Sequence, residues 1–230
     1  MVSLLTGWSL GILLGMRHAL EPDHLAAVST MVADRPSSRS AAALGAAWGL
    51  GHSLALLAAG GVLLALRTRM PLYLADLFEL AVAVMLLVLG ARSLHASFTS
   101  MSGGRAVGHD HHHEHHVHRG GPVAHLHLGR VTVARRPLVI GLLHGLAGSG
   151  ALTALVLASM PSTLSAVVYM VLFGAGSLFG MALLTGVVGL SLRRMAATAR
   201  AQAIIVGIAG SASVVLGLVG GLPLLLKLLR

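Results

Sequence analysis

The chain has 230 residues, of which 56% are hydrophobic, 10% are charged and 3% are aromatic. A soluble domain carries about 25% charged residues, so this composition excludes an ordinary soluble enzyme and predicts an all-α polytopic membrane protein. The formal charge of +9 does not indicate nucleic-acid binding, because the arginines lie between apolar segments, as the positive-inside rule expects. The absence of cysteine excludes disulfides and thiolate metal sites.

The first apolar segment, residues 4–33, is long enough to cross a bilayer but carries unusual chemistry. Ionisable groups at membrane depth are costly and mark functional sites, and here they are Arg17, His18, Glu21, Asp23 and His24, with Pro22 among them. On a straight helix, Asp23 and His24 would point about 140° and 240° away from His18.

Pro22 predicts a break in this first span, because it has no N–H to donate and its ring clashes with the preceding turn. We expect the break to turn His18, Asp23 and His24 towards one point and to leave the carbonyl of His18 free. Two imidazoles and a carboxylate suit Ni²⁺, Co²⁺ or Zn²⁺, so the stretch is interpreted as an intramembrane metal site. Arg17 and Glu21 are interpreted as a structural i,i+4 pair and not as ligands. The alternative for the whole stretch is a kinked helix with this pair, whose histidines are hydrogen-bonded to their neighbours.

Five further apolar segments follow, each at or above the roughly 20 residues that a membrane helix needs: 40–66, 71–97, 136–160, 163–192 and 200–226. The predicted organisation is a three-span unit at 1–98, a histidine-rich linker at 99–135 and a second three-span unit at 136–230. The units share short matches at nearly one offset: 15–20 with 141–146, 51–54 with 175–178, and 88–90 with 215–217. We therefore expect six transmembrane helices as a 3+3 inverted repeat, with the substrate site near the midplane.

Other candidate residues lie on the later spans. His52, near the middle of the second span, is interpreted as a further ligand, and the alternative is a histidine that bridges two helices. His144 occupies the repeat position of His18, where a ligand and a scaffold role are equally expected. Asp76 and Glu79 form either an acidic mouth or an interfacial pair.

The linker carries a histidine tract that predicts weak, unselective metal binding and no fold of its own. His125 and His127 follow a run that comprises His109, His111, His112, His113, His115, His116 and His118. Arg67, Arg69, Lys227 and Arg230 fall on the side of the termini, and the other connections, including the linker, are richer in arginine. The linker is therefore expected to be cytoplasmic, in a multi-pass protein of the cell (inner) membrane.

These motifs resemble the nickel/cobalt transporter family. The His-x4-Asp-His element at 18–24 and the Leu-Gly-His-Ser element at 50–53 are its signatures, and the run at 141–150 is similar to the urease-accessory-type nickel permease branch. The resemblance implies secondary transport of Ni²⁺ and Co²⁺, with His18, Asp23, His24 and His52 at the selectivity site. Typical uptake members have eight spans, whereas six spans with a histidine-rich linker also resemble efflux members.

The function that we expect is a secondary permease for Ni²⁺, and also for Co²⁺, that works by alternating access in the direction of uptake. The divalent metal ion is then the substrate, the bilayer is the surrounding partner, and no cofactor is needed. The alternatives are an efflux permease, an intramembrane zinc-dependent hydrolase and a metal-sensing accessory protein. The hydrolase lacks support in the sequence, which contains no His-Glu-x-x-His helix.

Overall fold

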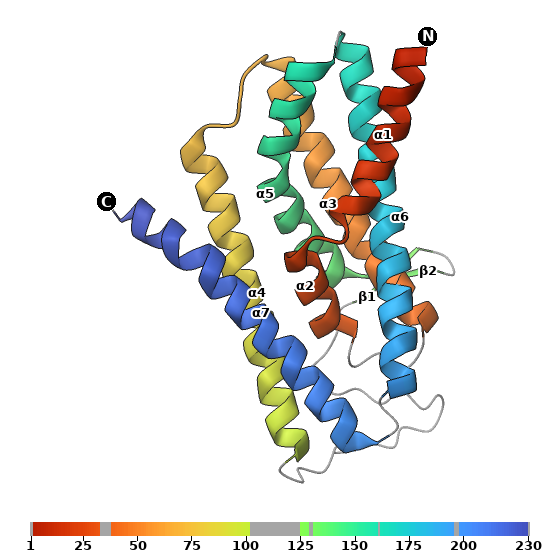
Figure 1. Ribbon diagram of the computed structural model, residues 1–230, viewed down its shortest axis with the longest axis vertical. Coiled ribbons are helices and arrows are strands. Elements are labelled where there is room, and N and C mark those ends of the chain that lie inside the picture. The colour runs from red at the N-terminus through yellow and green to blue at the C-terminus, as the bar shows by residue number, and fades with distance from the viewer. Residues whose placement is uncertain are drawn as a thin grey trace.

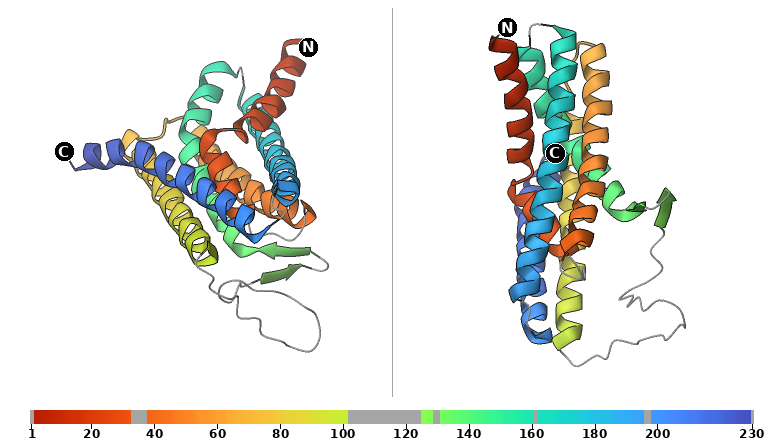
Figure 2. Two further views of the ribbon diagram at one scale, coloured as in Figure 1. Left: turned by 60° about the horizontal axis from the view of Figure 1, so that its bottom comes forward. Right: turned by 90° about the vertical axis from the view of Figure 1, so that its right-hand side faces the viewer.

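The computed structural model describes residues 2–32, 38–101, 125–128, 131–160, 162–195 and 198–229. These residues form a bundle of long helices with one short β-hairpin at its side (Figures 1 and 2). In chain order the elements are α1 (Val2–His18), α2 (Pro22–Val32), α3 (Ser38–Ala65), α4 (Leu72–Met101), β1 (His125–Leu128), β2 (Val131–Ala134), α5 (Arg135–Ser159), α6 (Thr163–Met195) and α7 (Ala199–Leu228).

The predicted count of six helices is wrong, because the described residues form seven. The difference is the break in the first span, where α1 ends at His18 and α2 begins at Pro22. The other five segments each became one helix close to the predicted bounds. The hairpin was not predicted, since β1 and β2 pair antiparallel within the segment interpreted as a linker without regular structure.

The surface pattern of the helices is that of a membrane protein. Of the described helices, four are long and apolar enough to span a bilayer: Arg39–Ala65, Leu72–Met101, Thr163–Leu192 and Arg200–Leu228. Large apolar side chains point outward along them, for example Val62, Val88, Ile208 and Val219. Several polar side chains are buried instead and bind the backbone of a neighbouring helix, because lipid offers them no hydrogen-bond partner. Ser53 Oγ of α3 donates to the Gly174 carbonyl of α6 at 2.8 Å, and Ser213 Oγ of α7 donates to the Leu86 carbonyl of α4 at 2.9 Å.

Small residues bring the helix backbones into direct contact. Gly15 of α1 lies against the carbonyl of Phe173 in α6, and Gly141 of α5 lies against the carbonyl of Trp48 in α3. A Cβ at either glycine would overlap that carbonyl. Helices α1 and α6 run in one direction and α3 and α5 in the other, while α4 and α7 cross as an antiparallel pair (Figure 1).

Two apolar clusters flank the region where α1 breaks. One contains Trp48, Met181 and the buried face of α2, and the other joins α3 to α6 around Met170 and Phe173. Each cluster contacts a histidine through an aromatic side chain. Between ring centroids, His24 lies 5.2 Å from Trp48 of the first cluster, and His18 lies 5.4 Å from Phe173 of the second. The break therefore lies between two close-packed regions, which hold its residues in place.

The close contact of α5 with α3 gives a stability prediction. Gly141→Ala should lower the free energy of unfolding by about 1–3 kcal/mol, because the added methyl group meets backbone that cannot move aside. Thermal unfolding in detergent measures the change. The matched control is Gly61→Ala, where a Cβ meets nothing within 4 Å, so the better helix propensity of alanine should raise stability by up to about 1 kcal/mol. Equal effects of the two variants would contradict the packing described.

Candidate metal centre

The break in the first span is a tight turn over residues 19–21. The N–H of Leu20 donates to the carbonyl of Arg17 at 2.9 Å, and the N–H of Glu21 donates to the carbonyl of His18 at 3.1 Å. Pro22 then opens α2, where a helix does not need the missing N–H. The expectation that the His18 carbonyl is left free is therefore wrong, because the turn supplies it with the N–H of residue 21.

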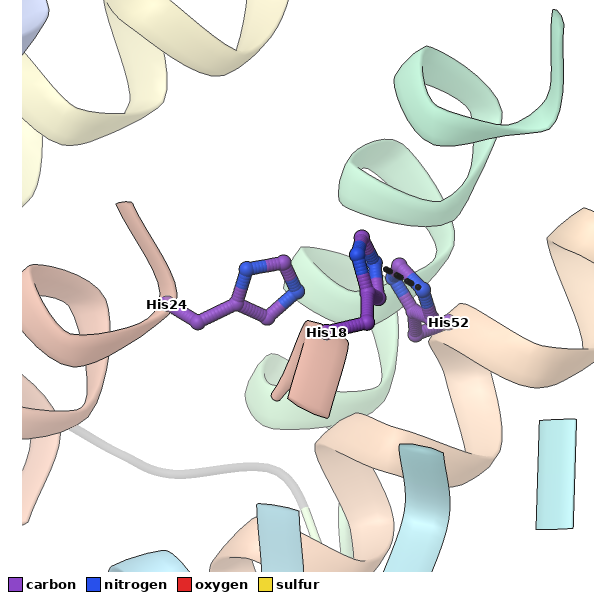
Figure 3. A group of neighbouring side chains, drawn as sticks. All are labelled: His18, His24 and His52. Atoms are coloured by element: carbon purple, nitrogen blue, oxygen red, sulfur yellow. Dashed lines mark hydrogen bonds between the residues drawn. The ribbon is translucent and has the colours of Figure 1, made fainter. Parts of the chain in front are cut away.

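The turn brings three histidines together across two spans (Figure 3). His18 and His52 approach with their Nε2 atoms 3.2 Å apart. The His24 ring lies 4.7 Å from that of His18 and 5.4 Å from that of His52, between centroids. Each of the three offers a ligand nitrogen, and these atoms lie within 4.8 Å of one another. The predicted convergence of His18 with His24 is thus present in the fold, and α3 contributes His52.

Asp23 lies between His24 of this group and His144 of α5. Its Oδ1 accepts the backbone N–H of His24 at 2.9 Å and lies 3.0 Å from Nδ1 of the same histidine. Its Oδ2 lies 2.8 Å from Nε2 of His144. Asp23, His24 and His144 form a second group whose ligand atoms lie within 4.8 Å of one another. The expectation that Asp23 meets His18 at one point is therefore not met in the described residues, because Asp23 is bound to His144 instead.

These imidazoles are enclosed and incompletely bonded. His24 and His52 are fully buried, and His144 is 3% exposed. Within the described part of the chain, His24 Nε2, His52 Nδ1 and His144 Nδ1 have no hydrogen-bond partner. A buried polar atom without a partner costs about 1–3 kcal/mol, so such a group of atoms is expected to bind an ion or ordered water.

Two carboxylates orient the histidines of the first group. Glu21 Oε1 lies 3.0 Å from His18 Nδ1, and Asp23 holds Nδ1 of His24 in the same way. Each contact engages Nδ1 and leaves Nε2 to face the other members of the group, which is how outer carboxylates fix the tautomer of metal-binding histidines. The role of Glu21 was missed, since the sequence interpretation paired it with Arg17. The i,i+3 spacing of His18 and Glu21 was the available signal.

One pair of nitrogens in the first group has the spacing of two ligands on a divalent ion. A tetrahedral ion with metal–nitrogen bonds of about 2.0 Å places its ligands about 3.3 Å apart, close to the 3.2 Å between the Nε2 atoms of His18 and His52. Imidazole nitrogen suits zinc, nickel, cobalt and copper, whereas magnesium and calcium prefer oxygen.

The remaining candidates lie elsewhere. Asp76 pairs with Lys227 between α4 and α7 at 2.6 Å, and Glu79 is exposed on α4. The histidine tract His109 to His118 lies outside the described residues, and His125 and His127 belong to β1.

One comparison with known proteins gives a full-length relative. Urease accessory protein UreH of Bacillus sp. (strain TB-90) is 30% identical over 218 residues, which cover 94% of this chain and 91% of the relative. No family model matches the chain, and no solved structure matches it.

The turn before α2 provides a test of the geometry. Pro22→Ala should let α1 continue towards α2, so that the ligands diverge and Ni²⁺ affinity falls by about 10–100-fold, the range for loss of an orienting residue. The protein should stay at least as heat-stable, because residue 22 would then lie inside a continuous helix, where alanine is the better residue. Calorimetry in detergent measures the affinity, and Pro71→Ala, directly before α4, is the matched control. Unchanged affinity would mean that the hydrogen bonds of residues 19–21 hold the break without the proline.

Proposed function

The chain belongs to the family of the urease accessory protein UreH, and from this membership and its buried histidine cluster we propose that it is a membrane permease for Ni²⁺. The observation that carries the proposal is the convergence of His18, His24 and His52 inside a bundle of apolar helices. The resemblance of the same residues to the nickel/cobalt transporter signature favours Ni²⁺ first and Co²⁺ second. The ion is the substrate, and its ligands are the Nε2 atoms of these three histidines.

The depth of the cluster supports transport. His52 lies 14 residues from the start of α3 and 13 from its end (52 − 38 and 65 − 52). At about 1.5 Å per residue, that is about 20 Å from either end of the helix. An ion bound there has left the surface and has lost most of its hydration, which the imidazoles replace. A sensor or accessory protein that only binds metal would have no need of a site at this depth.

The repeated packing of the helices supports alternating access. Gly15 against Phe173 has its counterpart in Gly141 against Trp48, with offsets of 126 (141 − 15) and 125 (173 − 48). Gly90 against Gly210 has its counterpart in Gly217 against Ala83, both at an offset of 127 (217 − 90 and 210 − 83). Such pairs are expected of a 3+3 inverted repeat, in which the first span is divided into α1 and α2. In transporters of this type one repeat rocks against the other around a site near the midplane.

The membrane potential supplies a driving force for uptake. Each charge gains about 2.3 kcal/mol per 100 mV, hence a divalent cation gains about 4.6 kcal/mol on entering a cell that is negative inside. We therefore propose uptake as the direction. Efflux through the same site would need a coupled ion.

A zinc-dependent hydrolase would need a general base beside the metal, and both nearby carboxylates, Glu21 and Asp23, are engaged with histidine nitrogens.

Transport into proteoliposomes tests the proposal. The parent protein should carry Ni²⁺ into vesicles with a negative interior, and His24→Ala should reduce the rate to that of empty vesicles, because a three-ligand site cannot lose its central ligand and still replace the hydration shell. The matched control is His95→Ala, an exposed histidine of α4, which should transport as the parent does. Full transport by His24→Ala would exclude the site, and export from loaded vesicles without import would reverse the direction.

The linker should not form part of the path. Removal of residues 108–121 should leave the maximum rate unchanged and raise the KM for Ni²⁺, because a histidine tract concentrates metal without lining the route through the bundle. The same vesicle assay measures both constants. Complete loss of transport in a well-folded deletion variant would show that the tract takes part in conduction.

A further inference from the structure

We propose that the ion passes through two consecutive stations in the bundle, and that His24 belongs to both. The first station is His18, His24 and His52, and the second is Asp23, His24 and His144. This inference rests on the proposed transport of a divalent metal and adds the route that the ion takes between the two sides.

His24 lies between the other members of the two stations. Its ring centroid is 4.7 Å from that of His18 and 4.1 Å from that of His144. Within each station the ligand atoms lie within 4.8 Å of one another, and among the described clusters His24 alone occurs in both. Four helices contribute to the arrangement, since His18 ends α1, α2 carries Asp23 and His24, α3 carries His52 and α5 carries His144.

The two nitrogens of His24 serve different stations. Nδ1 lies 3.0 Å from Asp23 Oδ1, on the side of the second station. Nε2 is buried and has no partner among the described residues, which leaves it for an ion beside His18 and His52. An ion can therefore be bound first by one nitrogen of His24 and then by the other, while the ring stays in position.

Only one station can hold an ion at a time. A neutral imidazole has one lone pair and one N–H, so His24 binds metal through one nitrogen and donates a hydrogen bond through the other. With the ion in the first station, Nδ1–H donates to Asp23. With the ion in the second, the proton is on Nε2 and faces His18 and His52. In passing between the stations, the ring gives its proton to water at one nitrogen and takes a proton from water at the other. One N–H bond breaks and another forms, so the net charge of the ring does not change.

The stations differ in ligand type and in exposure, so they should bind the ion with different affinities. The first contains nitrogen alone and includes the fully buried His52. The second contains a carboxylate, and the side chain of Asp23 is 35% exposed. A conducting path needs sites that bind well enough to admit the ion and weakly enough to release it, and two adjacent sites meet this need better than one deep site.

A Co²⁺ titration of the full-length protein in detergent tests the proposal, with visible absorption to report the ligands and calorimetry to count ions. The variants are His18→Gln, His144→Gln, the double variant, and His24→Ala, with His95→Ala as the control. Glutamine at residue 144 keeps a donor for Asp23, which protects the fold. Metal bound to the histidine tract is the same in all variants, and the double variant defines it.

Above that background, the parent should bind one Co²⁺, and each single glutamine variant should still bind one, with different absorption. The variant that loses the stronger station should bind about 10–100-fold more weakly, whereas the other should keep an affinity close to that of the parent. His24→Ala should bind as little as the double variant. Two ions bound to the parent would overturn the exclusion between stations. Equal loss of binding in both single variants and in His24→Ala would show one undivided site, while leaving the proposed transport intact. A parent that binds nothing above background would instead refute the proposed function.

Transport by the same variants completes the test. His18→Gln and His144→Gln should each fail to move Co²⁺ across proteoliposomes although each binds it, because passage needs both stations. Circular dichroism and thermal unfolding establish that both variants are folded. Transport at the parent rate by either variant would show that its station is not on the route.

Discussion

The fold depends on a demand that the membrane makes on the backbone: each buried N–H and C=O needs a partner inside the protein. A helix can be interrupted at this depth only where the freed groups are bonded again. Here the turn at residues 19–21 does so, and Pro22 removes one N–H that would otherwise need an acceptor. The interruption brings His18 and His24 within reach of each other, and nothing on a continuous helix would do that.

Packing determines where the imidazoles point. Glycines at 141 and 145 let α5 approach the backbone of α3 at Trp48 and His52, which brings His144 to Asp23. Larger residues there would move α5 away, and the contacts between the two halves of the cluster would be lost. The metal chemistry proposed for the site is thus tied to residues that carry no functional group.

The sequence predicts some of this and leaves other parts open, for physical reasons. The long apolar helices were predictable because a bilayer requires long apolar segments, and the break because proline cannot continue a helix. The direction of the Asp23 side chain was not predictable, since it depends on the position of α5. The residue spacing within the first span says nothing about His144, which is 121 residues away in the chain. Glu21 was paired with Arg17 by its i,i+4 spacing. That spacing brings side chains together only on a continuous helix, and here a turn follows His18, so Glu21 contacts His18 instead. The strands at 125–128 and 131–134 were missed, because the segment was interpreted from its histidine-rich composition alone. Its alternating residues and the Val-Thr-Val run, separated by Gly-Arg, were the available signal.

The pairing of the helices also bears on how the protein is made. In the described chain, the main interfaces of α1, α3 and α4 are with α5, α6 and α7, and the first three spans make few contacts with one another. A ribosome releases the first spans into the bilayer well before their partners exist. Until α7 follows, α4 has lipid in place of its main neighbour, and the histidines of α2 and α3 have no enclosed site. Assembly of the bundle therefore completes only near the end of synthesis, when α7 reaches α4.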